Sequence, residues 1–242
     1  MQNANIWYMF HLLRYPIAGA FLLLLSALPA KAQQNLNMEE HDRKPYYFGI
    51  TLAANQSYFR LSHSDLFLKQ DSIMVAEPLK TVGFNLGLLA NLRLNHRFDL
   101  RVNPQLLFAN KNLYYKENYP QRETEKKVES IVVSFPIQLK FKSDRINNMR
   151  VYTIAGIKID QDLASNKATR RAEDLVKINK TTYGFELGAG FEFYFESFIF
   201  TPEFKISNGL NNVHVLDKNL RYSNVIDQLN SRMIVFSIHL QG

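Results

Sequence analysis

The chain has no cysteine among its 242 residues. Disulfide bonds, thiolate metal ligands, thiol nucleophiles and a lipid-modified N-terminal cysteine are therefore excluded, and noncovalent contacts alone must hold the fold together. The chain also lacks a strong charge of one sign, since its formal net charge is +7 and its basic residues are scattered. Nucleic-acid binding favours a clustered basic stripe with interleaved aromatics, so we expect no nucleic-acid partner.

Long apolar runs are equally scarce. The run at residues 17–30 falls short of the roughly 20 residues that a membrane-spanning helix requires. It follows a charged segment ending at Arg14 and leads to the small residues Ala30 and Ala32, which is the layout of a secretory signal. We predict a cleavable signal peptide at residues 1–32, with an uncleaved anchor as the alternative. No comparable run follows it, so a membrane location requires a closed β-barrel, which leaves no strand edge unpaired in lipid.

What the chain does contain is alternation of apolar and polar residues. Residues 181–195, TTYGFELGAGFEFYF, place apolar side chains on one face of an extended strand and mostly glycine or glutamate on the other. In the segment 150–160 the faces are mixed, because Tyr152 shares a face with Lys158, so a bulge or another facing is left open there. Eight segments are predicted to be strands, at 46–60, 81–94, 98–108, 130–141, 150–160, 181–195, 198–207 and 234–240.

The connections between these segments alternate in length. The short ones are 95–97, 143–149 and 196–197, and the long ones are 61–78, 116–127, 161–180 and 208–230. Short periplasmic turns and long outer loops are typical of an outer-membrane barrel, and an even strand count places both termini in the periplasm. A lipocalin would instead turn its apolar face inward around a ligand, which the small and charged second face disfavours.

The sequence therefore predicts an all-β fold, an eight-stranded antiparallel transmembrane β-barrel at residues 46–242, in the cell outer membrane and in contact with its lipid bilayer. Residues 33–45 are predicted to form a periplasmic N-terminal tail. Local irregularities are expected at Pro136 and Pro202, because proline removes a ladder hydrogen bond. An outward-facing aromatic girdle is expected near the periplasmic rim, made by Tyr46, Phe48, Phe98, Phe141, Phe195, Phe198 and Phe200.

The inside of such a barrel has room only for its own side chains or one small ligand. The side chains predicted to form a lumen ion-pair network are Arg93, Asp99, Arg101, Lys140, Glu186, Glu192, Glu203 and Lys205. Buried charges require partners, and equal numbers of each sign allow mutual pairing. If the hairpin around His96 is symmetric, Arg93 lies opposite Asp99, and Asn91 lies opposite Arg101. A salt-bridged plug is favoured over a polar pathway or a ligand-binding lumen.

Catalytic, metal and cofactor sites are not indicated. The string SHSD at residues 62–65 supplies residue types used by lipid-modifying enzymes, but adjacent loop residues rarely give the contact between nucleophile and base that catalysis needs. The histidines show no metal-ligand spacing. Gly188 and Gly190 lie in a predicted strand instead of a dinucleotide-binding turn. We expect no enzymatic activity, no metal and no cofactor.

Several longer strings are distinctive, namely DRKPYYFG at 42–49, GFNLGL at 83–88, FDLRVNPQL at 98–106, KSDRINNMRVYTIAGIKIDQDLASN at 142–166, PEFKISNGLNN at 202–212 and YSNVIDQLNSR at 222–232. Together they resemble the PorT family of type IX secretion system outer-membrane β-barrel proteins. The resemblance implies a protein without enzymatic activity, required for type IX protein secretion and, where present, gliding motility, with other type IX components as partners. The chain departs from many outer-membrane barrels in ending on Gly242 instead of an aromatic residue, although Phe236 can supply an insertion signal.

We expect the barrel to act as an assembly or docking component. The turn at 143–148 is polar and long for a periplasmic turn, and the tail directly precedes the first strand. The candidate partner-binding residues are Asp42, Arg43, Lys44, Asp144, Arg145, Asn147 and Asn148, joined by Asp162, Asn166, Arg170 and Arg171 of an outer loop. The alternatives are a solvated turn and tail, a small-ligand or ion channel, and, least favoured, a lipid-modifying enzyme.

Overall fold

The structure, a computed structural model, describes residues 36–65, 67, 73–118, 122–126, 129–164, 178–216 and 222–242. The predicted signal peptide at residues 1–32 and the loop residues Asn166, Arg170 and Arg171 lie outside the described residues. Within the described part, no helix is long and apolar enough to cross a membrane. Antiparallel strands make up most of the described chain.

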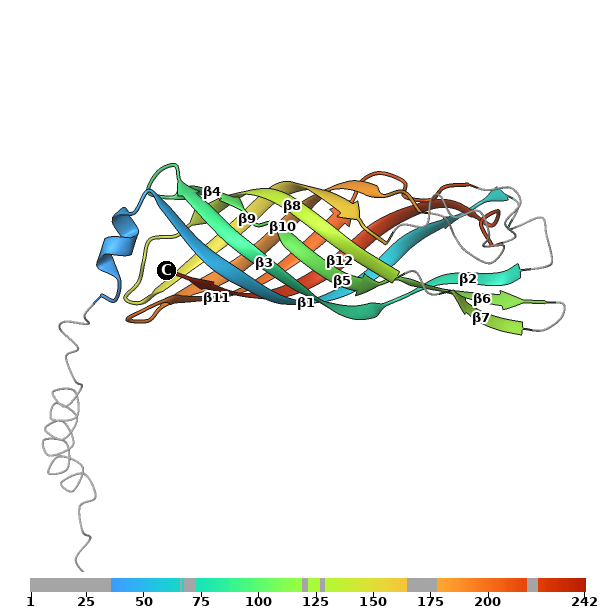
Figure 1. The fold of residues 1–242 in the computed structure, drawn as a ribbon, viewed down its shortest axis with the longest axis horizontal. Helices are drawn as coiled ribbons and strands as arrows, with labels where there is room; N and C mark the ends of the chain where they lie inside the picture. The colour runs from blue at the N-terminus through green and yellow to red at the C-terminus, as the bar shows by residue number, and fades with distance from the viewer. Residues whose placement is uncertain are drawn as a thin grey trace, which may run out of the picture. The chain divides into compact units, whose positions relative to one another are not determined.

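Eight strand positions close into a ring (Figure 1). In order around the ring they are β1 (Tyr46–His63), β3 (Thr81–Arg93), β4 (Phe98–Val102) with its continuation β5 (Gln105–Asn110), β8 (Glu129–Lys142), β9 (Met149–Asp162), β10 (Thr181–Tyr194), β11 (Ile199–Gly209) and β12 (Ile226–Gln241). β12 pairs with β1, where Gln241 lies opposite Gly49, so the sheet has no free edge in the ring. The predicted eight-stranded antiparallel barrel is confirmed.

The strand pairing is interrupted near both Pro136 and Pro202, as predicted. β4 and β5 form one strand position interrupted at Asn103 and Pro104, and each segment pairs with β3 and β8. Pro136 of β8 lies beside this interruption, and its carbonyl accepts a hydrogen bond from Asn103 N–H at 3.4 Å. Pro202 of β11 falls in a gap of the β10–β11 ladder. The missing proline N–H groups therefore coincide with positions where the ladder is already open.

Side chains alternate between the two faces of the ring. The outward-facing exposed residues are mainly apolar, among them Phe48, Leu88, Phe135, Ile157, Leu187, Phe204 and Phe236. β9 is regular, without a bulge against β8 or β10. Tyr152, Ile154, Lys158 and Asp160 all face inward and are buried. The sequence left open which side of this strand faces the lumen. The structure shows that its even-numbered residues face inward and its odd-numbered residues face outward.

The end that carries the long loops contains a second sheet that the sequence did not predict. β2 (Ile73–Leu79), β6 (Asn112–Glu117) and β7 (Arg122–Lys126) pair in the order β2-β6-β7. Figure 1 shows these three strands at the opposite end of the barrel from the C-terminus. The prediction that 61–78 and 116–127 are connections alone is therefore wrong, because each contains a strand.

A cluster of buried apolar side chains lies at this end, and we call it the loop-end cluster. Its members are Phe59, Ile73, Ala76, Leu113, Tyr115, Ile178, Val213, Tyr222, Val225, Ile226 and Leu229. Phe59 and Leu229 come from the inward faces of β1 and β12, whereas Leu113 and Tyr115 come from β6. Removing these side chains from water joins the second sheet to the barrel.

The other end of the barrel, which we call the short-turn rim, carries the turns at 94–97, 143–148 and 195–198. The short 3-10 helix η1 (Glu39–Arg43) precedes β1 and lies at this rim, near the C-terminus (Figure 1). The predicted girdle residues are found here, with Tyr46, Phe48, Phe141, Phe195 and Phe198 exposed and Phe98 and Phe200 half-buried. The Phe98 and Phe141 rings lie 5.2 Å apart between centroids, as neighbours on the outer wall.

Candidate functional site

The lumen is filled by paired charges. Seven of the eight predicted network residues are buried, Arg93 being the half-buried one. The ion pairs are Arg101 with Glu203 at 2.5 Å, Lys142 with Asp99 at 2.7 Å, Lys205 with Glu186 at 3.2 Å, Lys158 with Asp160 at 2.5 Å, and Lys140 with Glu192. Each of these charges is removed from water, so deleting one partner would leave the other buried without its counter-ion.

One pairing differs from the simplest expectation. Arg93 lies opposite Asp99 in the register, and Asn91 lies opposite Arg101, as the symmetric hairpin predicts. However, Asp99 is bound by Lys142 of β8, and Arg93 turns toward the mouth of the barrel. Lys142 was absent from the predicted set. Lys158, Asp160 and Arg150 were missed too, because the facing of their strand was left open.

Three tyrosine hydroxyls donate further hydrogen bonds to carboxylates of the lumen ion pairs. Tyr47 donates to Asp99 at 2.7 Å, Tyr152 donates to Glu203 at 2.7 Å, and Tyr194 donates to Glu192 at 2.9 Å. The Tyr152 ring fits only because the adjacent lumen position is Gly190, where a Cβ would lie 2.5 Å from the tyrosine hydroxyl.

Below the loop-end cluster, a cavity of about 20 Å³ lined by Lys111 and Asp160 has space for about one water molecule.

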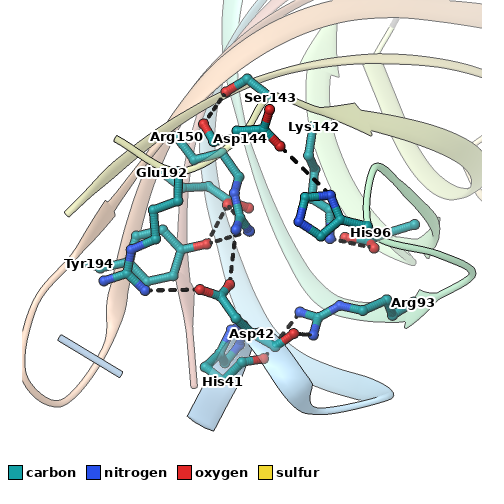
Figure 2. Close-up of polar contacts among 12 residues, drawn as sticks. His41, Asp42, Arg93, His96, Lys142, Ser143, Asp144, Arg150, Glu192 and Tyr194 are labelled. Carbon is teal, nitrogen blue, oxygen red and sulfur yellow. Dashed lines mark hydrogen bonds and ion pairs between the residues drawn. The ribbon is translucent and has the colours of Figure 1, made fainter. Parts of the chain in front are cut away.

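At the short-turn rim, the tail is held over the barrel mouth by Asp42. Its carboxylate accepts hydrogen bonds from Arg145 of the 143–148 turn at 3.1 Å and from Arg150 of β9 at 3.0 Å. The guanidinium of Arg93 donates to the His41 carbonyl at 3.1 Å and also to the Asp42 carbonyl. Figure 2 shows Asp42 and His41 between Arg93 on one side and Arg150 with Tyr194 on the other. Three basic side chains from three elements therefore hold one short segment.

Further contacts secure the beginning of the tail. Asn37 N–H donates to Asn148 Oδ1 at 2.9 Å, and the Asn37 amide donates to the Tyr194 carbonyl at 3.0 Å. The Arg145 guanidinium lies 3.8 Å from the centre of the Tyr194 ring, close enough for a cation–π contact. The tail and the 143–148 turn, predicted as parts of one partner-binding surface, therefore contact each other.

His41 is the buried side chain of this segment. Its ring is 3% exposed and packs edge-on against Tyr47, with 4.6 Å between centroids. Neither ring nitrogen has a hydrogen-bond partner among the described residues. Burial lowers the pKa of His41 from 6.5 to about 4. The docked tail therefore holds a neutral imidazole.

The remaining predicted partner-binding residues of the tail and the 143–148 turn face water, whereas Asp162 is buried and accepts a hydrogen bond from Ser130 Oγ. Arg43, Lys44, Asp144 and Asn147 are exposed, and Asp144 pairs with Arg97 at 3.1 Å. Asp42, Arg145 and Asn148 are engaged within the chain. The seven residues therefore divide into a group that fixes the tail and a group that remains available on the rim.

The SHSD segment does not assemble a catalytic arrangement. The His63 ring bonds to the Ala76 carbonyl at 3.0 Å, and Ser64 donates to the Asn224 carbonyl at 2.6 Å. Nucleophilic catalysis requires a hydrogen bond between the imidazole and the serine hydroxyl. Among the described residues, no such bond joins His63 to Ser62 or Ser64. No group of three or more potential metal ligands is found in the described part of the chain.

Comparison with known proteins gives one family match. Residues 32–215 match the family model described as outer membrane protein beta-barrel domain. A search of curated proteins finds no match. Solved structures similar to the chain include OprG of Pseudomonas aeruginosa (13% identity, 81% of this chain and 93% of that chain, TM-score 0.46), Neisserial surface protein A (11%, 81% and 96%, 0.45) and Ail of Yersinia pestis (12%, 82% and 100%, 0.37).

A closed ring with an apolar exterior and a charge-filled interior defines a membrane β-barrel. Because the family model covers most of the sequence, the chain belongs to the outer membrane protein beta-barrel domain family. The protein is therefore located in the outer membrane, where its exposed phenylalanines and leucines contact the lipid bilayer.

Proposed function

We propose that this protein is a non-enzymatic component of a type IX secretion system that acts in assembly or docking, as its resemblance to the PorT family implies. The observation that carries the proposal is the filled lumen, in which buried charges such as Arg101 and Glu203 are paired and the mouth is covered by the tail. A barrel without an open path exerts its effect through its surfaces. Small-ligand or ion conduction is accordingly the disfavoured alternative.

In this proposal the short-turn rim faces the periplasm, as short turns and both termini do in outer-membrane barrels. The partner-binding surface is formed by Arg43, Lys44, Asp144 and Asn147, which are exposed on that rim. Asp42 and Arg145 serve this surface indirectly, because their ion pair at 3.1 Å fixes the tail beside the turn.

Complementation of a deletion strain tests the proposal. We expect deletion to abolish secretion of type IX cargo, and Arg43→Ala with Lys44→Ala to reduce it while the barrel still shows its folded mobility on unheated gels. Glu196→Gln, an exposed change on the same rim, is the matched control and should secrete normally. Undiminished secretion by the deletion strain would exclude the role itself, whereas normal secretion by the Arg43 and Lys44 variant would exclude only this surface.

Conductance separates the channel alternative. The purified full-length protein in planar bilayers should show no current above that of protein-free membranes, because the described lumen is packed with side chains. Steady single-channel currents from the parent protein that are absent from protein-free membranes would contradict the sealed lumen.

A further inference from the structure

The outer wall near the long loops contains a pocket of about 510 Å³ whose lining includes two arginines. Arg60 of β1 and Arg232 of β12 are both exposed on outward-facing positions of neighbouring strands. The other lining residues are Ser62, Phe185, Asn208, Gly209, Leu210, Gln228, Asn230 and Ser231, so none of the ten is acidic.

Positive charge is concentrated around this pocket. Among the described residues neither Arg60 nor Arg232 has an ion-pair partner. Tyr58 lies opposite Arg232 in the β1–β12 register, two residues before Arg60, and the Lys80 ammonium lies 5.6 Å from the centre of its ring. Arginine presents a planar fork of donors that matches phosphate oxygens, and the amides and hydroxyls of the lining can supply further donors. The chemistry of the pocket therefore fits a phosphate group.

A second hollow lies on the same strands closer to the middle of the barrel wall. It measures about 400 Å³ and is lined by Leu52, Ala53, Ala54, Phe84, Asn85, Leu86, Phe236 and Ile238. Ala54 pairs with Phe84 on one side and with Phe236 on the other. A small side chain between two large ones leaves an apolar groove in the lipid-facing surface.

The separation of the two hollows matches the dimensions of one lipid leaflet. Ala54 and Arg60 lie six residues apart on β1, which corresponds to about 20 Å along a strand. With a typical tilt of about 40°, the difference in height is about 15 Å. Half of a hydrocarbon core of about 30 Å has the same thickness. A lipid whose phosphate lies at Arg60 would therefore extend an acyl chain into the hollow at Ala54.

We propose that the β1–β12 wall binds a phosphorylated lipid of the outer leaflet, with its phosphate held by Arg60 and Arg232 and an acyl chain in the hollow beside Ala54. The bound lipid covers an otherwise exposed apolar groove and neutralises both arginines. The site lies on the outer wall at the long-loop end. Its assignment to the outer leaflet rests on the proposed orientation of the barrel, but the site does not depend on the proposed role in secretion.

Native mass spectrometry of the full-length protein in detergent micelles tests this assignment, with diphosphorylated lipid A as the probe. We expect Arg60→Gln combined with Arg232→Gln to weaken binding by about thirtyfold, since each arginine near an anionic headgroup contributes about 1 kcal/mol. Lys180→Gln removes an exposed charge at the same end without touching the pocket and should bind as the parent protein does. Enzymatically dephosphorylated lipid A should bind the parent protein as weakly as the intact lipid binds the double variant.

A separate substitution tests whether an acyl chain occupies the hollow beside Ala54. Ala54→Leu fills the groove between Phe84 and Phe236 and should weaken lipid binding several-fold, while Ala155→Leu, on the outward face of β9, should not. Competition with inorganic phosphate identifies the source of the phosphate. If phosphate alone displaces the probe and Ala54→Leu has no effect, the pocket is a site for a free anion and the lipid assignment is wrong. Equal binding by the double variant and the parent protein overturns the site altogether.

Discussion

At the short-turn rim the barrel mouth is covered by a tail held through charges, whereas at the long-loop end it meets a core of buried apolar side chains. Asp42 bridges Arg145 and Arg150 across elements about a hundred residues away in sequence, and 30% of its side chain is still exposed. Leu113 and Leu229, in the loop-end cluster, are 0% exposed. The first closure is made by charged groups with a partly exposed carboxylate, and the second by buried apolar side chains.

This difference predicts different behaviour of the two ends. The ion pairs that hold the tail have one partly exposed partner, Asp42, and are therefore partly screened by salt, so we expect the tail to undock while the barrel stays folded. Burial of apolar surface is nearly insensitive to salt and is shared by many residues, so loss of the loop-end cluster should destabilise that whole end. The four predictions below test this contrast, beginning with the largest expected effect.

The buried ion pairs of the lumen should lose the most stability when one partner is removed. Glu203→Ala leaves the Arg101 guanidinium buried without its carboxylate partner, and we expect a loss of about 3–5 kcal/mol in the free energy of unfolding. Urea unfolding in lipid bilayers measures it. The double change Arg101→Met with Glu203→Leu removes both charges and should recover most of the loss. A single variant as stable as the parent protein would show that water enters the lumen.

The loop-end cluster should respond to a cavity. Leu113→Ala removes a fully buried side chain and should lower stability by about 3 kcal/mol, with no dependence on salt concentration. Leu216→Ala, a change at a leucine that is 59% exposed, is the matched control and should change stability by less than about 0.5 kcal/mol. Equal effects of the two substitutions would contradict a packed core at this end.

The tail should respond to the loss of one carboxylate. Asp42→Asn removes the charge that Arg145 and Arg150 share, and we expect tail docking to weaken by about 1–2 kcal/mol after allowance for solvent screening. Hydrogen exchange of residues 37–44 measures docking, and the strands should keep their protection. In a double-mutant cycle, Asp42→Asn and Arg145→Gln should be non-additive, and additivity would mean that the pair does not hold the tail.

The strands of the barrel were predictable because lipid on one side and charge on the other impose a strict period of two. β10, with glycine and glutamate alternating against phenylalanine, is the clearest example. β7 was not predictable, since the residues RETEK carry no apolar alternation and acquire their strand geometry by pairing with β6. Pro78 similarly obscured β2, because proline argues against a central strand.

The contacts of the candidate site were less accessible to sequence reasoning. The lumen charges could be named from parity, but the choice of Lys142 over Arg93 as the partner of Asp99 depends on a third strand, β8. The Asp42–Arg145 ion pair joins residues 103 positions apart and has no local signal in the sequence. His41 gave no signal either, since a single histidine in a polar tail does not indicate burial.

The smallest effect concerns acidity at the docked tail. Burial lowers the pKa of His41 to about 4. The positive charges of Arg93 and Lys44 lower this pKa further, and the carboxylates of Glu192 and Asp42 partly offset the decrease. In the undocked tail an imidazole has a pKa near 6.5. The undocked state therefore binds more protons between these values, so docking is fully stable above about pH 6.5 and weakens as the pH falls toward 4.

At pH 5.5 this linkage should weaken docking by about 1 kcal/mol relative to pH 7.5, and protease cleavage within residues 36–44 should become correspondingly faster. His41→Phe keeps a ring beside Tyr47 without a titrating group, so its cleavage rate should not change over this range. His96→Gln serves as the matched control, because His96 is exposed on the same rim and lies 3.7 Å from Asp144. A pH response that persists in His41→Phe but disappears in His96→Gln would move the sensitivity to the outer surface of the rim. In that case the arginines alone would hold the docked tail. The stability of docking would then vary with salt concentration but not with protonation of His41.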